Sequence, residues 1–382
     1  MRRRHRLALP PCRRPGRLTA LRVLLVAQQL RRSAPGGIGT YVRGLAGGLA
    51  GDPESGRHAV SLLASRAPKG VDPLDELGLP VLASPLPDHV LTRAWHAGLL
   101  AAPRGFDVVH ATSFNAPRSS APLTMAVHDL AWRVVPETFP TRGRRWHDAA
   151  LAKAVRRATT LIVPSQAAAD QLMAAGAGAG QVEVLDPMYG CDHLSPPDDA
   201  GAVALLARLG VTGPYLLSVG TLEPRKNLAR LMEAYSRARP SLPEPWPLVV
   251  VGPRGWGEAL GSAPPAGVLL AGGVDDAVLS ALYAGARAVA YVPLHEGFGL
   301  PAVEAMAAGA PVVATPMPST GGAALDVGPL DIEAMAGALV QAVTDERCRA
   351  RLIAAGHARA GQLTWAAVAA RHLQLWESLA QR

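Results

Sequence analysis

Two carboxylates flank a glycine-rich loop within residues 291–316, which read YVPLHEGFGLPAVEAMAAGAPVVATP. Glu296 starts the loop, and Glu304 lies eight positions later in the helix that Pro301 is expected to open. Backbone N–H groups of such a loop point outward at the positive end of the helix dipole, which makes an anion site. Two acids beside an anion are unfavourable unless they accept hydrogen bonds from hydroxyls. An anion with hydroxyls on both sides describes a sugar nucleotide, with its sugar, diphosphate and ribose.

The spacing of these residues resembles the donor-binding signature of retaining glycosyltransferases of the GT-B fold, of the family 4 type (glycosyl transferases group 1). The resemblance implies that Glu296 faces the transferred sugar and that Glu304 holds the ribose hydroxyls. The implied donor site also contains the loop and helix-start residues Gly297, Phe298, Gly299 and Leu300. The alternative is a glycine-rich turn between a core strand and a core helix, with two solvated acids.

A basic pair follows the predicted strand that ends at Gly220. Arg225 and Lys226 lie in TLEPRKNL, before a helix expected from Asn227. Arginine grips a diphosphate with a planar fork and lysine adds a point charge, so together they oppose a diphosphate charge of about −2. The resemblance extends to VGTLEPRKNL as a phosphate loop, and it implies that Gly220, Arg225 and Lys226 bind the donor. The alternative is a solvated surface pair.

The same charge balance makes a divalent metal unnecessary. The sequence has no Asp-x-Asp at a predicted strand end and no His/Cys/Asp ligand cluster. We therefore expect no metal and no cofactor, with a nucleoside-diphosphate sugar acting as the donor substrate.

His128 ends a predicted strand in the phrase VHDL, where the family carries a histidine beside the donor sugar and phosphate. We expect a catalytic role for it, although a structural histidine is the alternative, and Asp129 either orients it or caps the turn. Nearer the start, Gly37 and Gly39 belong to a loop that in the family covers the donor phosphates and the acceptor. A dinucleotide-binding loop is disfavoured because the pattern GGIG differs from G-x-G-x-x-G.

Strand and helix patterns alternate along the chain, which predicts an α/β fold with parallel sheets. The predicted strands cover 21–27, 59–64, 80–83, 106–111, 121–129, 159–165, 182–185, 214–220, 246–252, 267–272, 287–292 and 310–314. The predicted helices include 143–157, one that Ser165 caps, and segments from Asp275 and Asp331 onward. Two similar halves facing a cleft are the GT-B arrangement: two Rossmann-like domains.

The predicted boundaries follow from composition. Residues 1–20 form a basic tail, 21–190 an acceptor domain, 191–363 a donor-nucleotide domain, and 364–382 a helix that crosses back to the first domain. Residues 186–200 are rich in proline and turn residues and are interpreted as the linker.

The net charge of +8 is concentrated in the tail, which holds seven arginines and no acid. The remainder carries only +1, so a nucleic-acid-binding surface is not supported. The tail is expected to be disordered, and peripheral contact with anionic lipid at the inner face of the plasma membrane is one use for it. An idle tail or a mis-assigned start codon is favoured over that contact. Three widely spaced cysteines indicate no disulfide framework, which fits a cytoplasmic protein.

The predicted function is retaining transfer of a hexose, such as mannose, to a glycan, lipid or small-molecule acceptor. Two alternatives remain open: a nucleotide-sugar epimerase of the same architecture, and a non-catalytic sugar-nucleotide binder. The second is motivated by residues 316–326, where the family usually has a longer segment.

Overall fold

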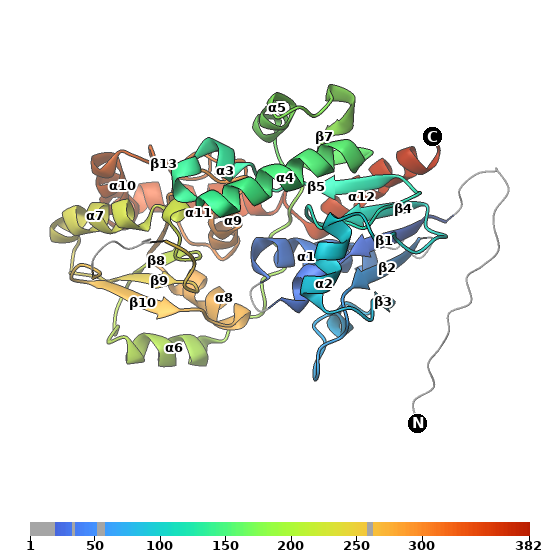
Figure 1. Ribbon diagram of the computed structural model, residues 1–382. Coiled ribbons are helices and arrows are strands. Elements are labelled where there is room, and N and C mark those ends of the chain that lie inside the picture. The colour runs from blue at the N-terminus through green and yellow to red at the C-terminus, as the bar shows by residue number, and fades with distance from the viewer. Residues whose placement is uncertain (1–19, 33–34, 52–57, 258–262) are drawn as a thin grey trace.

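The computed structural model describes residues 20–32, 35–51, 58–257 and 263–382. It contains two parallel sheets side by side, one built from each half of the chain (Figure 1). The predicted tail therefore lies outside the described residues except for Ala20, and so does Cys12. Cys191 and Cys348 are buried free thiols. Among the described residues, no helix has the length and apolar character needed to cross a bilayer.

The first sheet has the order β3-β2-β1-β4-β5-β6-β7, with every neighbouring pair parallel. Its strands are β1 (Arg22–Val26), β2 (Ala59–Ala64), β3 (Val81–Ala83), β4 (Val108–Ala111), β5 (Leu123–Ala126), β6 (Thr160–Val163) and β7 (Val182–Val184). The central strands are continuous apolar runs because helices cover both faces of the sheet.

Two sets of helices cover this sheet. One face carries α1 (Gly36–Gly51) and the C-terminal helix α12 (Trp365–Ala380), and the other packs against α2 (Asp88–His96), α4 (Thr141–Arg157) and α5 (Gln166–Ala174). Short turns α3 (Ala131–Val134) and η4 (Pro136–Thr138) precede α4. Ser165 caps α5 by accepting a hydrogen bond from the N–H of Ala168, as predicted.

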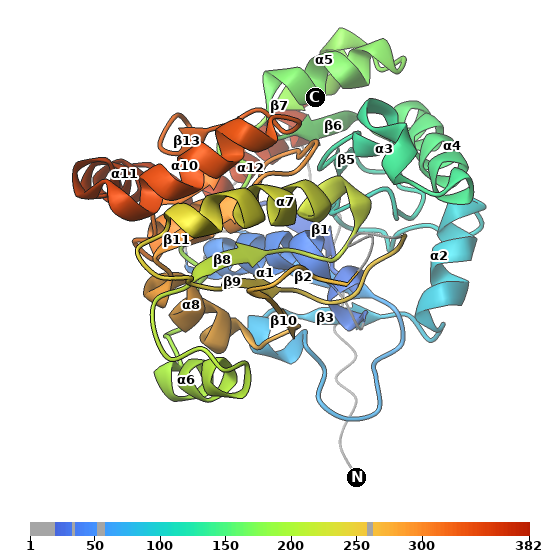
Figure 2. The same ribbon diagram turned by 90° about the vertical axis from the view of Figure 1, so that its left-hand side faces the viewer.

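The second sheet has the order β10-β9-β8-β11-β12-β13 and is also parallel. Its strands are β8 (Leu216–Val219), β9 (Leu248–Val251), β10 (Val268–Gly272), β11 (Ala288–Tyr291), β12 (Val312–Ala314) and β13 (Leu325–Asp326). Figure 2 shows helices on both sides of it. They are α6 (Asp199–Arg208), α7 (Leu228–Ala238), α8 (Asp276–Gly285), α9 (Leu300–Ala307), α10 (Ile332–Thr344) and α11 (Glu346–Ala360).

The predicted α/β class and the facing halves are confirmed, whereas several local boundaries were wrong. The strand predicted over 121–129 ends at Ala126, so His128 lies in the loop beyond it. The helices α2 and α6 were not predicted, and α6 begins inside the segment interpreted as linker. These helices are only nine and ten residues long, so the apolar period extends over few turns, which explains the omissions.

Helix α12 lies against α1, so the end of the chain covers the first sheet. Glycine is required at this crossing, because a Cβ at Gly44 would lie 1.9 Å from the Trp365 ring. At the same place, the N–H of Trp365 donates a hydrogen bond of 2.8 Å to Asp192 in the connecting segment. The two halves are therefore joined by α12 as well as by residues 185–198.

Candidate functional site

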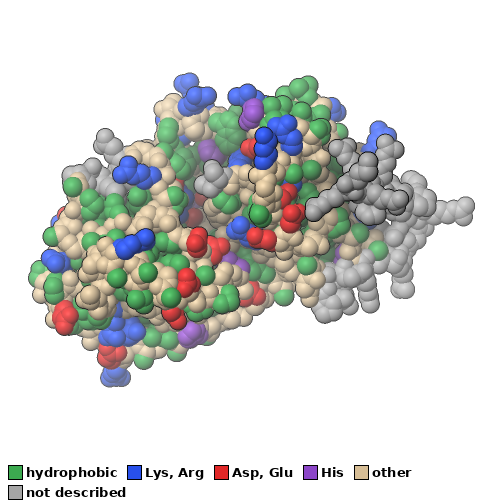
Figure 3. All heavy atoms as spheres, turned by 90° about the horizontal axis from the view of Figure 1, so that it is seen from below, with side chains coloured by type: hydrophobic (Ala, Val, Ile, Leu, Met, Phe, Trp, Pro, Cys, Tyr) green, Lys and Arg blue, Asp and Glu red, His purple; other side chains and the backbone are tan. Residues whose placement is uncertain are grey.

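A cleft of about 1620 Å³ lies between the two halves. Loops at the carboxyl ends of β1, β4, β5, β8 and β11 line it, which is where parallel α/β sheets place their ligand sites. Side chains of both charge signs gather along the junction of the halves on the face seen in Figure 3. The volume exceeds that of a typical single-ligand pocket, roughly 300–1,000 Å³, so the cleft has room for two reactants.

The two predicted cations and the first predicted carboxylate meet in this cleft. Glu296 Oε2 accepts hydrogen bonds from Lys226 Nζ at 2.6 Å and from Arg225 Nη1 at 3.0 Å. The Tyr291 hydroxyl donates a third hydrogen bond to the same oxygen, also at 2.6 Å. Arg225 further donates to Glu223, with 3.0 Å between Nε and Oε1. Two cations and two carboxylates thus form one network.

Local backbone geometry holds the basic pair at the end of β8. A 3-10 turn covers Pro224–Lys226, and Asn227 follows it with a φ of 60°. Its buried amide donates hydrogen bonds to the carbonyls of Val292 and Pro329, so the turn is tied to the β11 loop. Asparagine tolerates this left-handed conformation better than most residues.

This network corrects the predicted charge balance. The positive charges of Arg225 and Lys226 are neutralised by Glu223 and Glu296 in the protein itself. Burial by itself would raise the pKa of Glu296, but the charges of Arg225 and Lys226 and the hydrogen bonds to its carboxylate outweigh burial and lower that pKa. Burial of Glu223 dominates instead and raises its pKa. A diphosphate entering here would compete with carboxylates for the cations.

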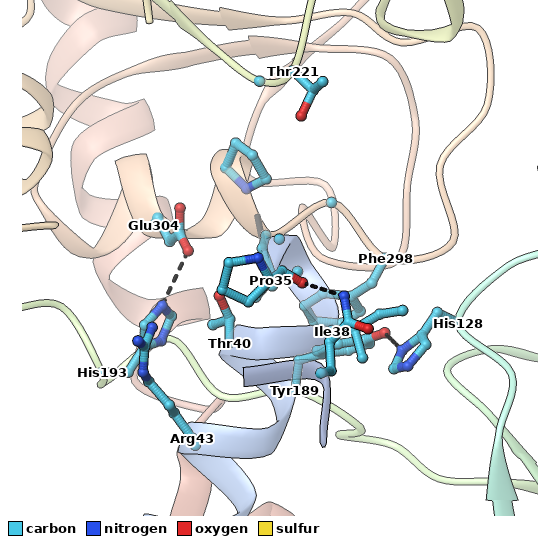
Figure 4. A pocket seen from close by; sticks show the side chains of 18 of the residues that line it. Pro35, Ile38, Thr40, Arg43, His128, Tyr189, His193, Thr221, Phe298 and Glu304 are labelled. Carbon is cyan, nitrogen blue, oxygen red and sulfur yellow. Dashed lines mark hydrogen bonds and ion pairs between the residues drawn. The ribbon is translucent and has the colours of Figure 1, made fainter. Parts of the chain in front are cut away.

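The second predicted carboxylate, Glu304, is buried in α9 and is held at both oxygens. Oε2 accepts a hydrogen bond of 3.0 Å from the Tyr283 hydroxyl, and Oε1 lies 3.1 Å from His193 Nε2. Trp365 Nε1 donates to the other ring nitrogen of His193, so Nε2 is the nitrogen left to donate to Glu304. Figure 4 shows Glu304 and His193 pointing toward each other, with a dashed line marking this interaction.

His128 lines the cleft with both ring nitrogens engaged. Its Nε2 donates to the Thr112 carbonyl at 2.7 Å, and its Nδ1 is hydrogen-bonded to the Tyr189 hydroxyl. Burial lowers the pKa of His128, so the ring is held neutral. Asp129 caps the following turn by accepting the N–H of Ala131, which settles its open role in favour of the cap. His128 is therefore a neutral cleft-lining residue whose ring is held in one orientation.

The glycines predicted to bind the donor separate into two groups. Gly37, Gly220 and Gly299 line the cleft, together with Phe298 and Leu300. Gly39 does not; it faces Pro35, whose Cβ would lie 2.4 Å from an added Cβ. Gly297 is also not in the cleft lining, because it packs against the His128 carbonyl, where an added Cβ would lie 1.9 Å away. Gly297 is therefore a point of contact between the halves, and its contact with the donor stays a prediction.

The shortened segment 316–326 is packed against the predicted site. The Ser319 hydroxyl donates to the Gly299 carbonyl at 2.9 Å, and Arg359 donates to the carbonyls of Pro318 and Ser319. Gly299 has a φ of 96° and contacts Met317 from this segment. The short form of the segment therefore supports the start of α9 rather than leaving it open.

Sequence reasoning missed four side chains that organise the site: Glu223, Tyr283, Tyr291 and His193. Tyr283 and Tyr291 lie in periodic apolar runs, where a tyrosine has the pattern of a core residue. His193 lies in an irregular segment with no periodicity. Glu223 stands two residues before Arg225 in the same loop, and that spacing was the signal available for it.

Comparison with known proteins identifies two family matches. Residues 213–345 match the family described as "Glycosyl transferases group 1", and residues 36–187 match the "Glycosyl transferase 4-like domain". Together these matches cover the second sheet, every strand of the first sheet except β1, and most of the cleft-lining loops.

Curated relatives include two mannosyltransferases. The O-antigen chain mannosyltransferase B of Escherichia coli is 28% identical over 270 residues, which cover 68% of this chain and 71% of the relative. The phosphatidyl-myo-inositol mannosyltransferase of Mycobacterium tuberculosis is 29% identical over 297 residues, covering 72% of this chain and 74% of the relative.

Solved structures share the fold at low identity. Anabaena Alr3699/HepE, in complex with UDP and glucose, superposes with a TM-score of 0.66 and 21% identity, covering 94% of this chain and 100% of that one. The sucrose-phosphate synthase from Thermosynechococcus elongatus gives a TM-score of 0.67 and 21% identity, covering 94% and 99% of the two chains.

Proposed function

This chain belongs to the GT4-type glycosyltransferases of the GT-B fold, and from that premise we propose that it transfers mannose from a nucleoside-diphosphate sugar to a hydroxyl acceptor with retention of anomeric configuration. The choice of mannose rests on the curated relatives, because both of those described above are named mannosyltransferases. The acceptor is a glycan, a lipid or a small molecule.

One observation carries the proposal: Arg225, Lys226, Glu296 and Glu304 line the same cleft. Had the cations lain on another face of the protein, no single ligand would have joined them to the two carboxylates. The diphosphate would lie between the basic pair and the start of α9, with the ribose at Glu304 and the transferred sugar at Glu296. When the diphosphate displaces Glu223 and Glu296 from the cations, Glu296 becomes free to accept hydrogen bonds from sugar hydroxyls.

The proposed chemistry needs charge stabilisation rather than a protein nucleophile. The bond from the anomeric carbon to the β-phosphate oxygen breaks, and the acceptor oxygen forms a bond to the same face of that carbon. The acceptor proton goes to the departing phosphate. Arg225 and Lys226 stabilise the negative charge that grows on the diphosphate, which is the role of fixed charges in an oxyanion site.

We propose that the reaction needs no divalent metal, because Arg225 and Lys226 supply the positive charge at the leaving group once the diphosphate displaces Glu223 and Glu296 from them. His128 is neutral and held by Thr112 and Tyr189, so its proposed role is to shape the sugar site and hydrogen-bond at a fixed position. Closing of the two halves would exclude water from the activated donor.

The experiment that tests the proposal has two steps. Thermal unfolding is measured first with GDP-mannose, UDP-glucose and UDP-N-acetylglucosamine, since a ligand that binds the folded protein raises the unfolding midpoint. The stabilising donor is then incubated with mannosides in the presence and absence of EDTA, and the product anomer is identified by NMR. The product is expected to keep the anomeric configuration of the donor sugar. The rate of transfer is expected to be the same with and without EDTA.

A parallel incubation without acceptor distinguishes transfer from isomerisation of the donor. Appearance of an isomeric nucleotide sugar would replace the transferase proposal with an epimerase. Donor binding without turnover on any acceptor would indicate a non-catalytic binder.

A further inference from the structure

Aromatic residues are scarce in this chain, at 4% of its residues, yet they concentrate in the cleft. Three of the four phenylalanines and four of the seven tryptophans line it. Most globular proteins use such residues in their cores. Their placement here calls for an explanation that the donor site alone does not supply.

Six rings form a connected group, which we call the aromatic wall: Phe114, Trp132, Phe139, Trp146, His147 and Trp256. The His147 ring stacks on Trp132 with 4.6 Å between centroids, and Trp146 meets His147 edge-on at 4.8 Å. Phe139 lies 5.7 Å from Trp256, which belongs to the second half. The wall therefore spans the cleft from one half to the other. It includes residues of α3 and α4, the helices that approach the second half in Figure 1.

Two tryptophans of the wall leave much of their surface open. The exposed fraction is 44% for Trp146 and 36% for Trp256. Trp256 is also fixed in place, because its Nε1 donates a hydrogen bond of 3.0 Å to the Thr138 carbonyl of the first half. Contiguous exposed apolar surface in a groove marks an interaction site, whereas single scattered apolar residues are ordinary on protein surfaces.

The aromatic wall lies beside the proposed donor site, on the side of the cleft formed by α3, α4 and the loop bearing Trp256. Trp132 follows Asp129, the neighbour of His128, by three positions. The loop bearing Trp256 contacts the loop of the basic pair, since a Cβ at Gly255 would lie 3.3 Å from Glu223 Cβ. A ligand on the wall would thus lie next to the sugar end of the donor, near Glu296. That is the position an acceptor must occupy.

Polar atoms interrupt the apolar surface. Ser113 and Asn115 line the cleft next to Phe114, and the Asn115 carbonyl oxygen is hydrogen-bonded to His96 Nε2 at 2.8 Å. A pyranose ring matches such a surface, because it has one face of C–H groups that packs on an aromatic ring and hydroxyls at its edge. An acyl chain would match the rings but would make no hydrogen bonds with Ser113 and Asn115.

We propose that the aromatic wall is an acceptor subsite that stacks a pyranose ring, so that the acceptor of this enzyme is itself a glycoside. The proposal rests on the proposed function, and it narrows the three acceptor classes to those carrying a sugar ring. Trp146 provides the exposed stacking face, and Trp256 closes the subsite from the second half.

The test uses the full chain and three variants. Trp146→Ala removes the stacking face, Trp146→Phe keeps an aromatic ring, and Leu99→Ala is the matched control, an apolar residue of the same half that is 78% exposed and outside the cleft lining. Transfer to methyl α-mannopyranoside and to α-mannobiose is measured, along with hydrolysis of the donor in the absence of acceptor.

Trp146→Ala is expected to raise the KM for the mannoside about fivefold, in line with about 1 kcal/mol for one aromatic contact. The donor KM and the donor hydrolysis rate should stay unchanged, Trp146→Phe should restore most of the acceptor affinity, and Leu99→Ala should match the wild type. An unchanged acceptor KM in Trp146→Ala would overturn the subsite while leaving the proposed function intact. Efficient transfer to an alkyl alcohol that lacks a sugar ring, equally lowered by Trp146→Ala, would assign the wall to lipid instead.

A second readout does not depend on turnover. Titration of methyl α-mannopyranoside should change the tryptophan fluorescence of the wild type, and Trp146→Phe should reduce that change. If no donor supports transfer, the proposed function fails, and a fluorescence response to the mannoside still decides whether the wall binds pyranose.

Discussion

Lys226 Nζ lies 2.6 Å from Glu296 Oε2, which joins the cation predicted to bind the donor phosphate to the carboxylate predicted to bind the donor sugar. The two residues are 70 positions apart in the chain. In the free protein each is the other's counter-ion, so the site stays close to electrically neutral until a ligand separates them. Substituting one of the two residues at a time therefore tests the phosphate role of Lys226 apart from the sugar role of Glu296.

Replacing Lys226 with alanine should lower kcat/KM by about 10²- to 10³-fold, the usual effect of removing one charge stabiliser at a leaving group. Folding should change little, because Glu296 keeps its hydrogen bonds from Arg225 and Tyr291. Lys69→Ala, which removes an exposed lysine outside the cleft, is the control. Steady-state kinetics and thermal unfolding test both statements, and unchanged turnover in Lys226→Ala would contradict the phosphate role.

Replacing Glu296 with glutamine should have opposite effects on binding and turnover. The amide no longer neutralises Arg225 and Lys226, so calorimetry should show tighter binding of UDP or GDP, neither of which carries a sugar. Turnover should fall because the sugar loses its carboxylate partner. Weaker binding of both nucleotides would show that the carboxylate organises the cations instead of competing for them.

His193 should act on donor affinity through Glu304. His193→Ala removes a hydrogen bond to a carboxylate, worth about 1.5–3 kcal/mol, so the donor KM should rise about tenfold or more with kcat nearly unchanged. His193→Gln offers an amide N–H and should recover part of the loss. Equal KM in both variants and the wild type would mean that Tyr283 alone positions Glu304.

Gly297→Ala should force the two halves apart, because the new Cβ would lie 1.9 Å from the His128 carbonyl oxygen. We expect a radius of gyration above that of the wild type in small-angle scattering and a loss of transfer of at least about tenfold, as misplaced reactants produce. Gly337→Ala in α10 is the control, since nothing lies within 4 Å of a Cβ there. Wild-type scattering and rate in Gly297→Ala would disprove the close contact.

His372 should make stability depend on pH. Burial lowers its pKa to about 4, although its hydrogen bond to the Val368 carbonyl opposes this. The unfolded chain takes up this proton near its ordinary pKa of about 6.5, so the stability is complete above that pH and declines as pH falls toward about 4. The free energy of unfolding should drop by roughly 2 kcal/mol from about pH 7 to about pH 5 from this residue.

Urea unfolding at the two pH values tests this expectation in His372→Gln, where the decline should be smaller. His89→Gln, at an exposed histidine, should retain the wild-type decline. An equal decline in wild type and His372→Gln would assign the acid sensitivity to other groups, such as the neighbouring His110, whose pKa burial also lowers.

Much of the architecture could be predicted because parallel strands between helices are continuous apolar runs, and residues 21–27 and 287–292 show them plainly. The motif around α9 could be predicted for the same reason: a proline and glycines at fixed spacing dictate where a short helix starts and ends. Helices α2 and α6 have a proline before them and a glycine after them (Gly98 and Gly210), but they are only nine and ten residues long, so their apolar period extends over few turns. Gly297 and Gly39 are equally clear as glycines in the sequence, but what they approach depends on elements distant in the chain.

By itself, the sequence determined the alternation of elements, the loops that carry charge, and the family to which those loops belong, because these depend on the order and type of neighbouring residues. Only the tertiary structure decided that Glu296 neutralises Lys226, that His193 reaches Glu304, and that rings from both halves form one wall. Those contacts form when the two sheets and the C-terminal helix α12 pack together. The residue types within one segment do not indicate which distant segment will lie against it.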